Sequence, residues 1–126
     1  MKTREQQRAQ GAYEKVAAMK DKDNDKSYGR VCIHLPELIH RNGLCQTVAF
    51  LEAKGAKKPW FEQVLGDLAA VTKLARSGQE FAVEVRRAQL SDYQRFTRES
   101  LACAQWFKRY AEAILKVDAS EGVGDL

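Results

Sequence analysis

The chain has 126 residues, enough for one domain with a core that needs no metals or disulfides. Hydrophobic residues make up 44 % and charged residues 30 %, a balance that excludes membrane-embedded and disordered classes. The formal net charge is +4, but residues 118–126 hold no Lys or Arg against 3 Asp or Glu, so the rest of the chain carries about +7. That excess favours an anionic partner.

Three widely spaced cysteines, Cys32, Cys45 and Cys103, form no disulfide framework and indicate a reducing cytoplasm. The polar N-terminus does not resemble a signal peptide. No apolar run approaches the ~20 residues needed to cross a membrane, so we expect no membrane partner.

Apolar residues at helical spacing predict a first helix over residues 2–20, followed by a polar loop over 21–27. Ser27 is the expected N-cap of the second helix. Pro36 lies inside that helix, so we expect a kink or a restart near Leu35.

The pair Asn42-Gly43 is typical of a tight hairpin, which needs alternating apolar residues on both sides. Instead Leu44, Val48 and Leu51 follow it at i, i+4, i+7, and the residues before it have the same period. We therefore interpret Asn42-Gly43 as a joint between two helices, with glycine as a left-handed cap.

Gly55 is expected to end the third helix in the same way, and Pro59 to stand in the first turn of the fourth. Ser77-Gly78 is expected to end the fourth helix, and residues 79–89 to form a short fifth. No segment predicts a strand.

The last helix, roughly 92–116, gives the strongest helical signal, with Ser91 or Asp92 as its expected N-cap. Its apolar stripe consists of Phe96, Ser100, Cys103, Phe107, Tyr110 and Ile114. The sequence thus predicts an all-α, single-domain bundle of five to six helices over residues 1–117. An acidic, disordered tail is expected over 118–126.

The loop DKDNDKSYG partly matches a calcium site. Asp21, Asp23 and Asp25 occupy ligand positions one, three and five, but Lys26 replaces the required glycine and Cys32 the glutamate at position twelve. We therefore interpret this segment as a solvated loop.

Cys32, His34, His40 and Cys45 match no zinc template. His40 and Cys45 have no third group to orient them as a nucleophile pair. We identify no catalytic centre, metal site or cofactor motif, and predict that the protein is not an enzyme.

Lys54, Lys57 and Lys58 cluster at a helix end and the following turn. One cation would compensate the helix dipole, so three suggest a corner that faces phosphates. On the last helix, Arg95, Arg98 and Arg109 share one face, although a solvated face of mixed charge is an equal alternative. Such cations predict contact with a nucleic-acid backbone rather than with bases. The predicted RNA-binding residues are Arg41, Lys54, Lys57, Lys58, Arg95, Arg98, Lys108 and Arg109.

Two segments resemble a known family. Residues 35–55, LPELIHRNGLCQTVAFLEAKG, resemble L-P-x-x-I-x-x-N-G-L-x-x-x-x-A-F-L-x-x-K. Residues 93–115, YQRFTRESLACAQWFKRYAEAIL, resemble Y-x-x-x-T-x-E-x-L-x-x-x-x-W-x-K-R-x-A-x-A. The pair is similar to the small all-helical subunit, the fifth protein, of the type III-B CRISPR effector called the Cmr complex.

The resemblance implies a non-catalytic subunit whose copies stack in an inner filament and help hold target RNA paired to guide RNA. It implies contacts with the backbone and large subunits, while base pairing supplies specificity. Its matching polar positions are Arg41, Lys54, Lys108 and Arg109, whereas the other four basic residues rest on charge alone. Its structural positions are Leu35, Ile39, Leu44, Ala49, Phe50, Leu51 and Trp106.

Three alternatives stay open at this point. Residues 36–54 have lengths that suit a helix-turn-helix DNA binder, although the second helix offers few base-reading side chains. A homo-oligomeric adaptor without nucleic acid would use its charge only for solvation. An enzyme built on Cys45 and His40 is the most distant alternative.

Overall fold

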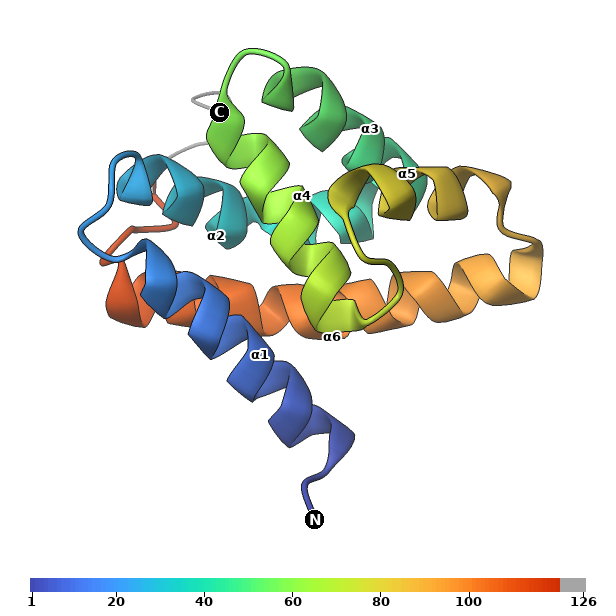
Figure 1. The fold of residues 1–126 in the computed structure, drawn as a ribbon, viewed down its shortest axis with the longest axis horizontal. Coiled ribbons are helices and arrows are strands. Elements are labelled where there is room, and N and C mark those ends of the chain that lie inside the picture. The colour runs from blue at the N-terminus through green and yellow to red at the C-terminus, as the bar shows by residue number, and fades with distance from the viewer. Residues whose placement is uncertain (121–126) are drawn as a thin grey trace.

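The computed structural model describes residues 1–120, which form six α-helices and no strand, in agreement with the predicted all-α fold (Figure 1). In chain order the helices are α1 (Arg4–Met19), α2 (Asp25–Asn42), α3 (Leu44–Gly55), α4 (Pro59–Thr72), α5 (Gly78–Arg87) and α6 (Leu90–Ile114). Residues 121–126, most of the predicted acidic tail, lie outside the described part.

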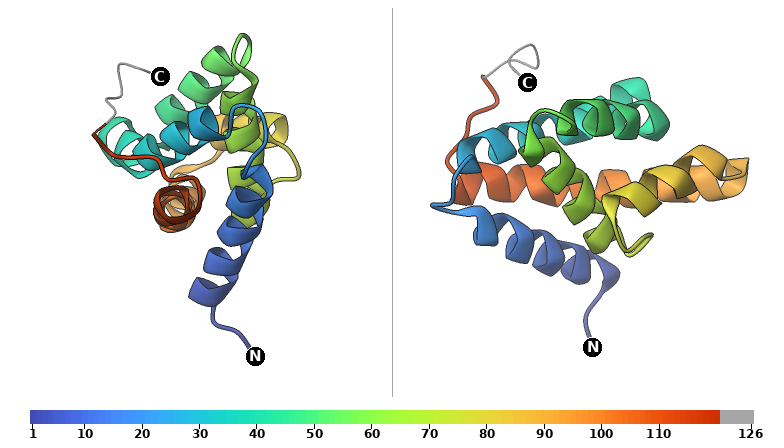
Figure 2. Two further views of the ribbon diagram at one scale, coloured as in Figure 1. Left: turned by 90° about the vertical axis from the view of Figure 1, so that its left-hand side faces the viewer. Right: turned by 45° about the horizontal axis from the view of Figure 1, so that its top comes forward.

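The longest helix, α6, runs horizontally below α2, α3, α4 and α5 in Figure 1, and α1 extends downward past it. Helices α1 and α2 pack mainly against α6, while α3, α4 and α5 pack against one another. Helix α4 contacts each of the other five and connects the two groups, as the views in Figure 2 show. None of the helices within residues 1–120 has the length and apolar content needed to cross a lipid bilayer.

A single core receives side chains from all six helices. The apolar stripe predicted on α6 faces this core: Ser100, Cys103 and Phe107 are fully buried, and Phe96 is partly buried. The largest side chains with almost no exposed surface are Tyr28, Phe61, Phe81 and Phe107.

Two N-terminal boundaries differ from the predictions. Helix α2 begins at Asp25 after Asn24, so the predicted cap at Ser27 is wrong. Asn24 adopts a left-handed backbone conformation, which asparagine tolerates. The chain therefore turns into α2 at Asp25, about one helical turn earlier than predicted. Helix α6 begins at Leu90 rather than after Ser91 or Asp92, and no side chain caps its start.

Of the kink or restart predicted near Leu35, the restart does not occur, because α2 is one helix from Asp25 to Asn42 with Pro36 inside it. A proline inside a helix costs about 3 kcal/mol through its missing donor and steric clash. Most of α2 is buried around it, including Leu35 and Ile39, and this apolar burial outweighs the cost.

The predicted end of the fourth helix at Ser77-Gly78 is wrong as well. Helix α4 ends at Thr72, where Lys73 turns the chain with a left-handed φ of 61°. Ser77 instead caps α5, since its hydroxyl accepts a hydrogen bond from the Glu80 backbone amide at 3.1 Å.

A polar pair lies inside the bundle between α2 and α4. The Tyr28 hydroxyl donates to Asp67 Oδ2 at 2.6 Å, and Lys15 Nζ lies 4.0 Å from Asp67 Oδ1. Burial raises the pKa of Asp67 above its usual 3.8, although the Tyr28 hydrogen bond and Lys15 act in the opposite direction. Ionisation of this buried carboxylate therefore has a cost to the stability of the fold.

This pair predicts a pH-dependent effect of Asp67→Asn. The folded protein binds the Asp67 proton more tightly than the unfolded chain, so this carboxyl lowers stability as pH rises from 3.8 through its raised pKa. Asparagine still accepts from Tyr28 but cannot ionise. Urea unfolding should show the variant gaining stability relative to wild type across that window. A difference in stability that stays constant with pH would contradict the assignment.

Candidate nucleic-acid interface

The joint between α2 and α3 is the first element of the site. Gly43 has φ 84° and ψ 162°. The predicted positive φ is confirmed, but the extended ψ places Gly43 outside the left-handed helical region, in one that almost only glycine adopts. Its amide donates to the Ile39 carbonyl at 2.9 Å, and its own carbonyl accepts from the Thr47 amide at 3.2 Å. One residue thus closes α2 and opens α3.

Tyr93 of α6 supports this joint. Its hydroxyl accepts a hydrogen bond from the Cys45 backbone amide at 2.9 Å, one of the α3 amides that has no partner within the helix. Cys45 belongs to the first resemblance motif and Tyr93 opens the second. The two segments that resemble one family therefore meet in space.

The lysine corner, Lys54, Lys57 and Lys58, lies in the turn between α3 and α4. The amides of Lys57 and Lys58 donate to the Lys54 carbonyl at 3.1 and 2.9 Å, which holds the three residues in one turn. Among residues 1–120, none of the three forms an ion pair. The Lys54 ammonium lies 5.8 Å from the centre of the Phe50 ring.

Gly55 ends α3 at this corner as predicted, but not with a left-handed conformation, because Gly43 is the only described glycine with a positive φ. A Cβ at Gly55 would lie 3.1 Å from the Glu62 Cβ, so the small residue allows α4 to pack closely.

The other predicted cations belong to α6 and the end of α2. Arg95 pairs with Asp92 at 3.3 Å and lies over the Phe96 ring at 5.0 Å. Arg41 pairs with Glu37 at 2.6 Å on the surface. The remaining three are Arg98 and Arg109, both exposed, and Lys108, which is partly buried.

The structure does not bring these eight residues into one patch. The turn between α3 and α4, beside the lysine corner, lies at the top of Figure 1, whereas α6 lies below all of α2 to α5. Both views in Figure 2 keep that turn and α6 apart. The lysine corner and the arginines of α6 are therefore separate candidate surfaces.

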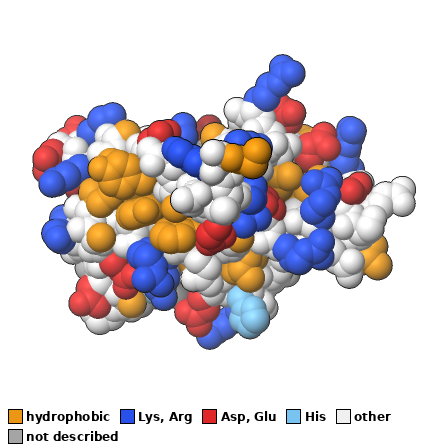
Figure 3. Space-filling model, turned by 90° about the horizontal axis from the view of Figure 1, so that it is seen from below, with side chains coloured by type: hydrophobic (Ala, Val, Ile, Leu, Met, Phe, Trp, Pro, Cys, Tyr) orange, Lys and Arg blue, Asp and Glu red, His pale blue; other side chains and the backbone are white. Residues whose placement is uncertain are grey.

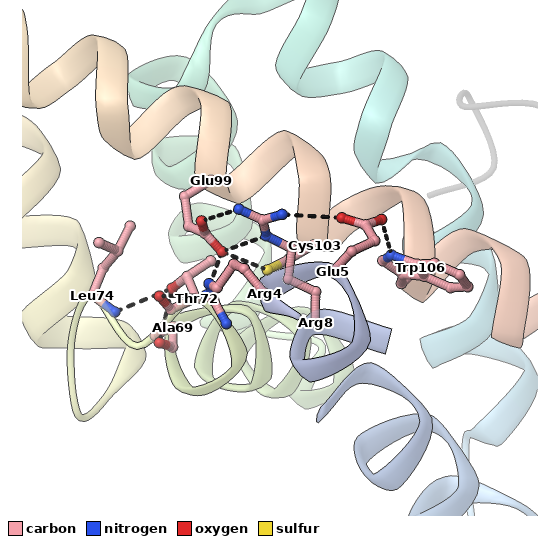
Figure 4. Close-up of polar contacts among 9 residues, drawn as sticks. All are labelled: Arg4, Glu5, Arg8, Ala69, Thr72, Leu74, Glu99, Cys103 and Trp106. Atoms are coloured by element: carbon pink, nitrogen blue, oxygen red, sulfur yellow. Dashed lines mark hydrogen bonds and ion pairs between the residues drawn. The ribbon is translucent and has the colours of Figure 1, made fainter. Parts of the chain in front are cut away.

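A polar network between α1 and α6 was not predicted from the sequence (Figure 4). Glu99 accepts from Arg8 through both carboxylate oxygens, at 2.9 and 2.7 Å, and also pairs with Arg4. Arg8 also forms an ion pair with Glu5 at 3.0 Å, and Glu5 accepts a hydrogen bond from the Trp106 indole N–H at 2.6 Å. Pairs 91 to 101 residues apart in the chain cannot be read from local spacing.

This network determines how its acids titrate. The Arg8 hydrogen bonds hold the pKa of Glu99 below its usual 4.5, and the Trp106 and Arg8 hydrogen bonds lower the pKa of Glu5. Glu99 is therefore charged in the folded protein, and its charge is used to join α1 to α6.

Aromatic side chains gather beside this network. The Tyr110 ring lies 5.5 Å from Tyr13 and 5.8 Å from Trp106, in edge-on and stacked geometry. Tyr13 remains 46 % exposed. Figure 3 shows hydrophobic side chains on this lower face, gathered on the side where the C-terminal half of α6 lies. This aromatic face suits contact with another protein surface.

The two buried cysteines, Cys32 and Cys103, do not provide a reactive thiolate. Burial raises the pKa of Cys32, and burial with the nearby Glu99 raises the pKa of Cys103 to about 12. Cys45 is partly buried, and its amide rather than its side chain makes the contact at the α2–α3 joint. Within residues 1–120, no three His, Cys, Asp or Glu side chains are placed to hold a metal ion.

Helix α3 does not resemble a recognition helix. Its buried residues include Leu44 and Leu51, two of the structural positions that the resemblance implies, and also Val48. Its exposed residues include Gln46, Ala49, Glu52 and Ala53, of which only Gln46 and Glu52 have groups that can read base edges. Ala49 is thus exposed rather than structural.

The described residues define a small all-α protein with unpaired lysines on its surface. Residues 4–114 match the family model of the CRISPR-associated protein (Cas_Cmr5). The CRISPR system Cmr subunit Cmr5 of Thermus thermophilus is 38 % identical over 116 residues, 92 % of this chain and 99 % of that protein. This chain belongs to the CRISPR-associated Cmr5 family.

A solved structure supports the same conclusion. The crystal structure of a CRISPR-associated Cmr5 family protein from Thermus thermophilus superposes with a TM-score of 0.85 at 40 % identity. The match covers 91 % of this chain and 99 % of that one.

Proposed function

We propose that this protein is a non-catalytic structural subunit of a Cmr-type CRISPR ribonucleoprotein that acts in the cytoplasm. Its copies stack beside the backbone and large subunits, and its cations contact the phosphates of guide or target RNA. The lysine corner carries this proposal, because three cations in one turn without ion-pair partners exceed what a helix end needs.

The aromatic face supports the protein-contact half of the proposal. Tyr13, Trp106 and Tyr110 combine a large apolar area with polar atoms at the edge, a composition typical of interface centres. It lies on α1 and α6, whereas the lysine corner joins α3 to α4. One copy can thus contact RNA and protein at the same time.

The double variant Lys57→Ala/Lys58→Ala tests the RNA half. In the assembled complex, RNA binding should weaken, and the slope of log K against log salt should flatten by roughly 0.7–0.9 per lost phosphate contact. Thermal stability should change little, because neither lysine is paired. Filter binding over a salt series gives the slope.

The control variant is Lys20→Ala/Lys22→Ala, which removes two exposed lysines after α1 and should leave the salt slope unchanged. An unchanged slope in the corner variant would remove Lys57 and Lys58 from the RNA path.

A further inference from the structure

A cleft of about 390 Å³ opens where the start of α1, the end of α4 and the first half of α6 meet. Its polar lining consists of Arg4 and Gln7 from α1, Lys73 after α4, and Arg95 and Glu99 from α6. Figure 4 shows Arg4, Thr72, Leu74 and Glu99 from these three elements converging beside it. Of the predicted cations only Arg95 lies here.

The charge of this cleft is positive. Arg4, Lys73 and Arg95 come from three elements, and Glu99 is the only carboxylate in the lining. Both Glu99 oxygens already accept from arginine side chains. The dipole of α4 places about half a negative charge at its C-terminus. Arg4 compensates this charge by donating a hydrogen bond to the Thr72 carbonyl at 3.4 Å.

Donors in the cleft remain available. Lys73 has no ion-pair partner among residues 1–120. The only ion pair of Arg95 in the described structure is with the exposed Asp92 at 3.3 Å, and such surface pairs exchange at a cost below about 1 kcal/mol. Arg4 Nη1 also has no hydrogen-bond acceptor in the described structure, but this atom is buried, so Lys73 and Arg95 are the available donors.

We propose that this cleft binds a phosphate group of the RNA backbone, an inference that rests on the proposed function. A planar carboxylate is best matched by one guanidinium fork, whereas the tetrahedral phosphate can accept from donors that approach from different directions. Lys73 and Arg95 provide such donors from two elements. Arg98, exposed less than one helical turn further along α6, offers a cation to the adjacent phosphate.

The test is a nuclear magnetic resonance titration of the full chain with inorganic phosphate and, separately, with a short oligouridine. Both should shift the amide resonances of residues 73, 74 and 95. In Lys73→Asn/Arg95→Gln these shifts should disappear, and the oligouridine Kd should rise about tenfold. Asparagine tolerates the left-handed backbone of Lys73, so the loss of charge is tested without added strain.

Lys116→Asn is the matched control, because Lys116 is another exposed lysine with a left-handed φ, 58°, but lies beyond the opposite end of α6. It should bind as wild type does. The cleft assignment is overturned if neither probe shifts residues 73, 74 and 95, or if a polyglutamate peptide shifts them while phosphate and oligouridine do not. Oligouridine shifts confined to the lysine corner would also overturn it, while leaving RNA binding at that corner supported.

Discussion

Glu99→Ala is expected to destabilise the fold by about 3 kcal/mol, at the lower end of the cost of breaking a buried ion pair. The Glu99 side chain is only 15 % exposed and pairs with both Arg4 and Arg8. Without it, these two guanidinium groups lose the charged acceptor that they share, and in the described structure keep only the Thr72 carbonyl and Glu5 as acceptors. Thermal denaturation should show a melting temperature lower by roughly 10 °C.

The matched control is Glu112→Ala, an exposed glutamate on the same helix with no ion pair in the described structure. It should change stability by less than about 0.5 kcal/mol. The pH dependence gives a second check. Because the pKa of Glu99 is below 4.5, its contribution is complete above that pH and is lost as pH falls through the lowered value. Equal stability of wild type and Glu99→Ala at neutral pH would show that the network does not hold α1 in place.

Gly43→Ala is expected to cost about 2 kcal/mol, through backbone strain rather than crowding. A Cβ there would lie 3.5 Å from the Tyr93 hydroxyl, which is ordinary contact, but φ 84° with ψ 162° is accessible to almost no residue except glycine. The strain acts at the point where Tyr93 supports the start of α3. Urea unfolding of the variant measures the loss.

Gly66→Ala provides the comparison. Gly66 lies within α4, and a Cβ there would meet nothing within 4 Å. Alanine should therefore stabilise the protein by about 0.5–1 kcal/mol through helix propensity. If both variants were equally stable, the conformation of the α2–α3 joint described here would be incorrect.

The helical architecture could be predicted from the sequence, because the apolar period of 3.6 extends over almost every element. The same period on both sides of Asn42-Gly43 correctly excluded a hairpin. The helix boundaries were less predictable. Asn24 precedes α2 in a left-handed backbone conformation, so the helix begins earlier than the capping pattern predicts. Lys73 ends α4 in a left-handed conformation in which a glycine would be expected. At Pro36 the apolar burial of the surrounding residues outweighs the cost of a proline inside a helix.

The candidate site was only partly predictable. Clustered lysines such as Lys57 and Lys58 are adjacent in the sequence, so the corner could be found. The cleft combines Arg4, Lys73 and Arg95 from distant segments, and Arg4 meets Glu99 across 95 positions. Helix packing creates that arrangement, and no local spacing indicates it.

The most direct test of the central claim is a purification of the tagged full-length protein from its native host at low salt. The eluate would be analysed for protein partners and for bound RNA. Co-elution of several Cmr subunits with a short RNA of discrete length is the expected result, and places the lysine corner inside a ribonucleoprotein. A single protein free of RNA, from cells shown to express the other Cmr subunits, would contradict the proposed function and favour an adaptor without nucleic acid.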